Sequence, residues 1–196
     1  MLKLARCRKR SRDGRPVGDA AGTAAAANEA AWLARCNGVG VGPELIAVRG
    51  GAVTMAFAEG PTIGAWLEAL AAGDGAVART VLADLLGQCR RLDAAAVDKR
   101  EMHRCSRHVV VSAAAGTCTL LDFERCATSA KPQNVTGIAQ YLTSAWASAQ
   151  LARAAVAVDV PAARAACGRY KADRADAAFR ALGTALGLVG GGGGGA

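Results

Sequence analysis

Aromatic residues and histidine are scarce in this chain of 196 residues. Aromatic side chains make up 4% of the sequence, and the two histidines are His103 and His108. A core with so few aromatic rings has to be built mostly from Leu, Val and Ala. The length suffices for one domain with such a core and is short for two.

The sequence also lacks long apolar runs and paired cysteine motifs. No stretch approaches the roughly 18 apolar residues that a membrane span requires. Seven cysteines occur, an odd number, without a Cys-x-x-Cys motif or a secretory signal before them. We therefore expect reduced thiols in an intracellular, cytoplasmic protein. The N-terminus is rich in Arg and Ala and poor in acidic residues, so organelle targeting stays open.

Acidic residues are too few to balance the basic ones, and the imbalance is local. Seven Lys and Arg residues and one Asp lie in the first sixteen positions, which gives +6 of the chain's net charge of +8. Such a cluster can attract an anionic partner, RNA or an acidic protein, and a solvated basic loop is the alternative. No aromatic side chain lies between these arginines, so the stacking component of RNA binding is absent. A nucleic-acid-binding module remains one alternative function.

The apolar periodicity predicts strands early in the chain and helices late, which is an α+β arrangement. The clearest helix is expected over residues 76–92, and residues 9–23 are expected to form a loop. A glycine run near the C-terminus is expected to be a flexible tail. The expected strands span residues 1–5, 44–49, 52–58, 109–111 and 119–121, and the expected helices span residues 24–36, 62–72, 76–92, 136–152 and two stretches within 161–186.

Two polar residues flank the predicted hairpin near residue 116. His108 precedes its first strand, and Asp122 follows its second strand, Leu120–Leu121. Both side chains are therefore expected at the same end of the hairpin, where they could grip one metal–phosphate group. A divalent metal is the usual partner of a carboxylate in phosphoryl transfer. An aspartate that only caps the turn after a strand is the alternative.

The loop before this hairpin holds further candidates for chemistry. Glu101 could accept a hydroxyl proton, and Arg104 could orient it or hold phosphate. His103 is a second candidate for the base. A zinc site formed by His103, Cys105 and His108 is a further alternative, although the spacing places no fourth ligand.

Three segments in this order resemble the motifs of one group of kinase-like proteins. These are the small serine/threonine kinases related to RIO-type kinases, to the kinase of the tRNA-modifying KEOPS complex and to bacterial lipopolysaccharide-core kinases. Their loop reads roughly Glu-[Leu/Met]-x-Arg-Pro-x-Lys-His, their metal motif is Asp-Phe-Glu, and Lys-Pro-x-Asn-Val-Thr follows before a helix. The matching segments here are Glu101–Val111, Leu121–Arg125 and Lys131–Thr136.

The resemblance implies a nucleotide site formed by the N-terminal part of the chain. Lys3 would contact the phosphates of ATP and pair with Glu29. The backbone at Ala56 and Ala58 would hydrogen-bond adenine, and Met55 would line the adenine pocket.

The resemblance also implies roles for the candidates in the loop and the hairpin. Glu101 falls where the family has its equivalent of the catalytic aspartate. Ordinary kinases space the base five residues before a metal-binding asparagine, whose place His108 takes here, and this spacing selects His103 instead. His108 and Asp122 would bind Mg²⁺.

The implied fold is a protein-kinase-like, two-lobed fold with an incomplete N-lobe sheet and a mainly helical C-lobe. Residues 1–60 would form the partial N-lobe, 61–188 the C-lobe and 189–196 a glycine tail. The family has two strands and a glycine-rich loop before the lysine strand, at which this sequence starts. We expect an ATP-dependent serine/threonine phosphotransferase that acts on a hydroxyl of a protein or a small molecule. A pseudokinase or nucleotide-binding scaffold, which the missing loop favours, is the alternative.

Overall fold

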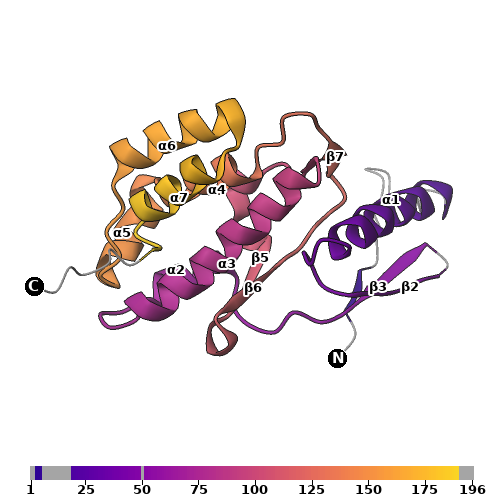
Figure 1. The fold of residues 1–196 in the computed structure, drawn as a ribbon. Helices are drawn as coiled ribbons and strands as arrows, with labels where there is room; N and C mark the ends of the chain where they lie inside the picture. Colours follow the sequence, from indigo (N-terminus) through magenta and orange to yellow (C-terminus); the bar gives the residue numbers. More distant parts are fainter. Residues whose placement is uncertain (1–2, 6–18, 50, 190–196) are drawn as a thin grey trace, which may run out of the picture.

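A three-stranded antiparallel sheet and one long helix form the N-terminal part of the chain (Figure 1). The computed structural model describes residues 3–5, 19–49 and 51–189. The strand order is β1-β3-β2, and helix α1 packs against β2 and β3. These elements are β1 (Lys3–Ala5), α1 (Asp19–Asn37), β2 (Leu45–Arg49) and β3 (Ala52–Met55).

The sequence predicts these four elements correctly but misplaces two of their ends. Helix α1 begins at Asp19, inside the loop expected over residues 9–23, because the alanine-rich stretch that follows strongly favours the helix. Strand β3 ends at Met55 rather than at residue 58. Helix α1 ends at Asn37, whose side chain donates to the carbonyl oxygens of Val41 (3.1 Å) and Pro43 (2.9 Å) and so fixes the turn into β2.

Helices dominate the remainder of the described chain, so the fold is α+β. Helix α3 runs through the middle of this part and carries a buried stripe that includes Leu82, Leu85 and Leu92. Helices α6 and α7 pack on each other on one side of it (Figure 1). The helices are α2 (Ile63–Ala69), α3 (Gly75–Ala94), α4 (Asn134–Leu142), α5 (Ala145–Arg153), α6 (Val160–Asp173) and α7 (Asp176–Ala185).

The prediction of a single helix over residues 136–152 is wrong, because two helices occupy this stretch. Helix α4 ends at Leu142, and Ser144 adopts an extended backbone with its side chain accepting from the Ala147 amide at 3.2 Å. Serine is a favoured N-cap because its hydroxyl satisfies a free amide of the new helix. In the new helix, α5, the side chain of Trp146 is 39% exposed.

Two small antiparallel sheets bring distant segments of the C-terminal part together. Strand β4 pairs with β7, and β5 pairs with β6, which confirms the hairpin predicted around Gly116. As a result, the loop after β4 and the loop after β6 lie next to each other. The strands are β4 (Val97–Asp98), β5 (Val109–Ser112), β6 (Thr117–Leu120) and β7 (Ala127–Thr128), with short 3₁₀ helices at Met102–Arg107 (η1) and Ala113–Ala115 (η2).

One phenylalanine ties the two parts of the molecule together. Phe123 is 1% exposed, and its ring lies against Gly42 so closely that a Cβ on that glycine would come within 2.7 Å of it. Leu33 of α1 borders the same space. Burying a phenylalanine contributes about 1.5–3 kcal/mol. This anchoring fixes the residues on either side of Phe123.

Candidate functional site

The pairing of β5 with β6 brings His108 and Asp122 together, as the sequence predicts. Val109 lies opposite Leu120, and the amide of Leu121 donates to the His108 carbonyl at 2.8 Å. The Nδ1 atom of His108 then lies 2.9 Å from Oδ2 of Asp122, and about a third of each side chain is exposed. With Nδ1 directed at the carboxylate, Nε2 is the ring nitrogen left for a ligand.

The backbone around this pair is strained. Asp122 has φ 65°, and Arg100 and Glu101 in the facing loop have φ 61° and 54°. Residues with a side chain rarely adopt this left-handed region, which costs about 1–2 kcal/mol per residue. Strained backbone of this kind clusters at functional sites, where the surrounding structure stabilises it. Half of the six positive-φ residues other than glycine in the described chain meet here.

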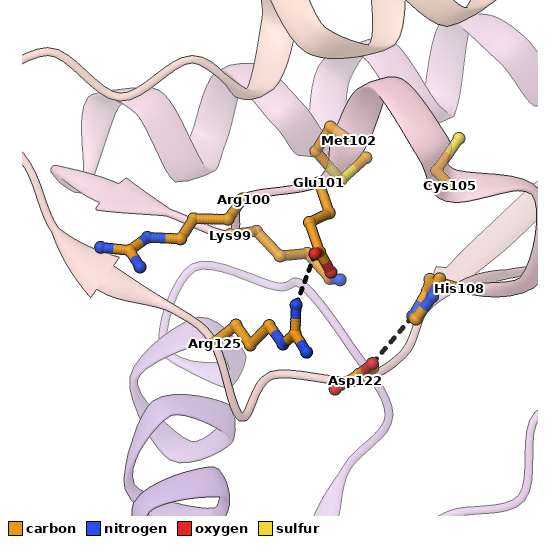
Figure 2. Close-up of a pocket in the computed structure, with 8 residues that line it drawn as sticks. All are labelled: Lys99, Arg100, Glu101, Met102, Cys105, His108, Asp122 and Arg125. Atoms are coloured by element: carbon orange, nitrogen blue, oxygen red, sulfur yellow. Dashed lines mark hydrogen bonds and ion pairs between the residues drawn. The ribbon is translucent and has the colours of Figure 1, made fainter.

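Eight residues line a small cavity between the two loops (Figure 2). Its volume is about 10 Å³, which is room for about one water molecule. Arg125 closes one side, because its Nη1 atom lies 2.5 Å from Oε1 of Glu101. Both side chains of this pair are largely exposed, so the contact is weak and can open. The lining residues are Lys99, Arg100, Glu101, Met102, Cys105, His108, Asp122 and Arg125.

A second, larger cavity lies on the other side of Glu101. Its volume is about 260 Å³, slightly below the roughly 300–1,000 Å³ of ordinary ligand pockets. Gly137 lets α4 approach η1, since a Cβ there would lie 2.9 Å from the Met102 side chain. The lining is polar and consists of Asp98, Arg100, Glu101, Met102, His103, Gln133, Thr136, Gly137, Gln140 and Lys171.

The structure therefore separates the three candidates in the loop between β4 and β5. Glu101 lines both cavities, whereas His103 lines only the larger one. Arg104 is exposed and lines neither of them. Of the two candidate bases, Glu101 is thus the one that the fold brings beside Asp122 and His108.

The structure does not form the zinc site considered for the same loop. Within the part of the chain that the structure describes, no three His, Cys, Asp or Glu side chains are grouped so that they could hold a metal ion. Cys105 is buried, and burial raises the pKa of its thiol to about 12, which opposes the thiolate that zinc requires. Mg²⁺ needs fewer protein ligands, because it binds through one or two carboxylates together with substrate phosphates.

A buried polar network holds the start of the loop between β4 and β5. The Asn134 side chain, which is fully buried, accepts from the Lys99 amide at 2.8 Å and donates to the Val97 carbonyl at 2.6 Å. It also donates to Asp93 at 2.8 Å, and Tyr170 donates to the same carboxylate at 3.1 Å. Burial raises the pKa of Asp93, and these donors oppose the shift. The network links α3, α4 and α6 to the loop.

The N-terminal part directs one carboxylate toward the site. Glu29 of α1 is partly buried, and burial raises its pKa, as do the nearby carboxylates of Asp122 and Glu124. A hydrogen bond from the Phe123 backbone opposes this shift. Lys3 lies in β1 opposite Met55, but its side chain is outside the described part of the chain, and so is the predicted Lys3–Glu29 pair.

The predicted adenine-binding segment leaves the sheet immediately after β3. The Ala56 amide donates to the Glu44 carbonyl at 2.8 Å and is therefore occupied. Among the described residues, the carbonyl of Ala56 and the amide of Ala58 have no backbone partner. Met55 is partly buried at the end of β3. The segment then joins the β5–β6 hairpin through the Val111 amide, which donates to the Pro61 carbonyl at 2.9 Å.

Sequence reasoning missed three features of this site: the Asp93–Asn134–Tyr170 network, the Arg125–Glu101 contact and the burial of Lys99. One signal was present, since Asp93 follows Leu92 and lies four residues after Cys89, on the apolar stripe of α3. A carboxylate on a buried helix face implies a buried partner. The partners themselves are 41 and 77 residues away, so the sequence pattern could not name them.

No protein-family model matches the chain, and no curated protein sequence is significantly similar to it. Among the described residues, no helix combines the length and the apolar character needed to cross a membrane.

Proposed function

We propose that this protein is an ATP-dependent phosphotransferase of the protein-kinase-like type, which moves the γ-phosphoryl group of ATP to a hydroxyl. The observation that supports it most is the convergence of Asp122, His108 and Glu101 around one small cavity. Phosphoryl transfer needs a metal-binding carboxylate and a group that takes the hydroxyl proton, both close to the transferred phosphoryl group.

Asp122 is the best ligand for Mg²⁺ in this site. Hard oxygen ligands suit Mg²⁺, whereas imidazole suits softer metals. Asp122 therefore fits as the direct ligand, and His108 fits either as a further ligand or as the group that orients the Asp122 carboxylate. The bound ion would neutralise charge on the phosphates of ATP. Carboxylates that raise the pKa of Glu29 add to the negative field that attracts a cation.

Glu101 is placed to serve as the general base. It lies between the small cavity and the polar cavity of about 260 Å³, which offers room for an acceptor hydroxyl. His103 lines the same polar cavity and is the second candidate. The acceptor is then either a small hydroxyl compound or one side chain of a protein that reaches into this cavity.

The adenine end of ATP would lie along the segment that follows β3. The carbonyl of Ala56 and the amide of Ala58 offer one acceptor and one donor beside Met55. Lys3 would contact the phosphates from β1. A partial N-lobe over residues 1–60 and a C-lobe over residues 61–188 complete this proposal.

A nucleotide-binding scaffold without efficient transfer is the second candidate function. The contact between Arg125 and Glu101 favours it, because the carboxylate of the proposed base is engaged and the cavity has room for only about one water. The two functions differ in whether bound ATP is turned over.

Binding and turnover of ATP with Mg²⁺ by the full chain test the proposal. Asp122→Asn tolerates the left-handed backbone and should abolish the Mg²⁺-dependent part of ATP binding, measured by calorimetry. Glu101→Ala should bind ATP and stop transfer. Glu68→Ala removes an exposed carboxylate of α2 and should change neither. Equal ATP binding by the native chain and all three variants would contradict the assignment of Asp122 as the metal ligand. Tight ATP binding without transfer by the native chain would favour the nucleotide-binding scaffold.

A further inference from the structure

Lys99 is a buried lysine at the centre of the candidate site. Only 4% of it is exposed, and it follows β4, where its amide is fixed by Asn134. Figure 2 shows its side chain running into the space between Glu101, Arg125 and Asp122. The neighbouring Arg100 extends away from that space in the same view.

Among the described residues, no carboxylate lies within ion-pair distance of the Nζ atom of Lys99. The lysine therefore lines the small cavity without an ion-pair partner there. The Phe123 ring, whose centroid lies 5.4 Å from Nζ, compensates part of the charge. Burial lowers the pKa of Lys99, and the Asp122 carboxylate opposes this shift.

A buried lysine without an ion-pair partner lowers the stability of the ligand-free protein. A buried charge is costly unless it is paired, and lysine side chains are almost never fully buried without a partner. A cation–π contact returns only part of this cost. An anion that enters the cavity would supply the missing partner, so the lysine raises affinity for an anion at the expense of stability.

The cavity selects the size and the kind of that anion. Its volume of about 10 Å³ accommodates one oxygen atom rather than a whole nucleotide. Glu101 borders it on one side and Asp122 on another, so the oxygen would belong to a group that lies between the proposed base and the proposed metal ligand. A phosphoryl group presents such oxygens with negative charge.

We propose that the ammonium group of Lys99 binds an oxygen of the phosphoryl group that is being transferred. The inference rests on the proposed function in naming ATP as the donor. In the transfer, the acceptor oxygen forms its bond to the γ-phosphorus while the bond from that phosphorus to the bridging oxygen of ADP breaks. The acceptor proton goes to Glu101, and ADP leaves with the electron pair. Lys99 neutralises charge on a non-bridging oxygen throughout.

The test compares ATP with ADP, because only ATP carries the γ-phosphoryl group. Lys99→Met keeps an unbranched side chain that is one atom shorter and removes its charge. We expect it to weaken Mg²⁺-dependent ATP binding about tenfold or more, as loss of a charged hydrogen bond does, and to change ADP binding less than twofold. Lys131→Met, the same substitution at an exposed lysine, should change neither affinity.

Thermal unfolding provides the second measurement and separates a binding role from a structural one. Lys99→Met should raise Tm in the absence of ligand by about 2–4 °C, since it removes an uncompensated buried charge. Inorganic phosphate at high concentration should raise the Tm of the native chain and leave that of Lys99→Met unchanged. Lys99→Gln serves as the second variant, and failure of both variants to fold overturns the inference because the lysine would then be structural.

The outcomes distinguish this inference from the proposed function. If Lys99→Met binds ATP as the native chain does while Asp122→Asn does not, the inference is overturned and the proposed function stands. If the native chain binds neither ATP nor ADP but phosphate raises its Tm only when Lys99 is present, the anion site stands and the proposed function fails. A native chain that responds to none of the three ligands overturns both.

Discussion

The N-terminal part and the helical part of the molecule differ in how much buried apolar side chain holds them. The core between α1 and its sheet consists of Ala26, Ala30 and Val53, with Leu45 and Met55 packed beside it. The core of the helical part is continuous, includes most of the buried Leu, Val and Ile side chains of the described chain, and extends into the N-terminal part through Leu33, Cys36 and Val41. Because hydrophobic stabilisation follows the apolar area that is buried, the first part is held more weakly than the second.

Each part also contributes one carboxylate, the buried Asp93 in the helical part and the partly buried Glu29 in the N-terminal part. The two differ in the groups that surround them. Asp93 accepts hydrogen bonds from the Asn134 amide, the Asn134 side chain, the Val135 amide and Tyr170. Glu29 instead faces other carboxylates, which raise its pKa together with burial. The helical part thus satisfies its buried carboxylate with four hydrogen bonds and holds the loop, whereas the Phe123 backbone opposes the shift of Glu29 with a hydrogen bond that burial and the neighbouring carboxylates outweigh.

Removal of the Asp93 carboxylate should have the largest effect on this comparison. Asp93→Ala leaves four donors without their acceptor in the interior, and we expect the free energy of unfolding to fall by roughly 3–5 kcal/mol. Urea unfolding followed by circular dichroism measures it. Asp93→Asn retains part of the acceptor capacity and should lose less. A loss below about 1 kcal/mol for Asp93→Ala would show that the network does not hold the loop.

The sequence predicts the elements of both parts better than it predicts the contacts between them. The apolar stripe of α3 and the β5–β6 hairpin follow from local periodicity, and the hairpin alone places His108 beside Asp122. The break at Ser144 is a local signal as well, but the apolar residues Tyr141–Leu142 before it and Ala145–Ala147 after it continue the helical pattern and hide it. A serine between two helix-forming stretches can cap a new helix or remain inside one, and tertiary packing decides which.

The burial of Lys99 could not have been predicted, because it depends on long-range packing. The residues on either side of it, Asp98 and Arg100, are charged, and the local sequence reads as a solvated loop. Burial follows from the pairing of β4 with β7 and from Asn134, which lies 35 residues further along the chain. Contacts of this kind are set by the whole fold rather than by the local pattern.

Replacement of Glu29 should have a smaller and opposite effect to that of Asp93. A carboxyl group whose pKa is raised on folding binds its proton more tightly in the folded state. The native stability therefore falls as the pH rises from 4.5, the ordinary pKa, through the raised value. Glu29→Gln removes this penalty, so we expect it to be more stable than the native chain at pH 7 by at most about 1 kcal/mol, after allowance for solvent screening.

The pH dependence of this gain provides the check. The difference in unfolding free energy between Glu29→Gln and the native chain should shrink toward zero as the pH is lowered below 4.5, where Glu29 of the native chain carries its proton in the folded and in the unfolded state. Glu44→Gln, at an exposed position of the same part, should show no comparable gain. A loss of stability at pH 7 for Glu29→Gln would instead indicate a cationic partner of Glu29 and would support the predicted Lys3–Glu29 pair.

Removal of Arg125 should have the smallest effect on stability. Its contact with Glu101 joins two side chains that are 60% and 45% exposed, and exposed pairs contribute about 0.2–1 kcal/mol. We expect Arg125→Gln to lower the free energy of unfolding by less than about 0.5 kcal/mol, and the difference to disappear in high salt because exposed charges are screened. Arg90→Gln should lower the free energy of unfolding more, since Arg90 pairs with Asp176 and its guanidinium carbon also lies 4.4 Å from the centroid of the Phe179 ring. If Arg125→Gln proved the more costly change, the contact would be part of the fold rather than a contact that can open over the proposed base, Glu101.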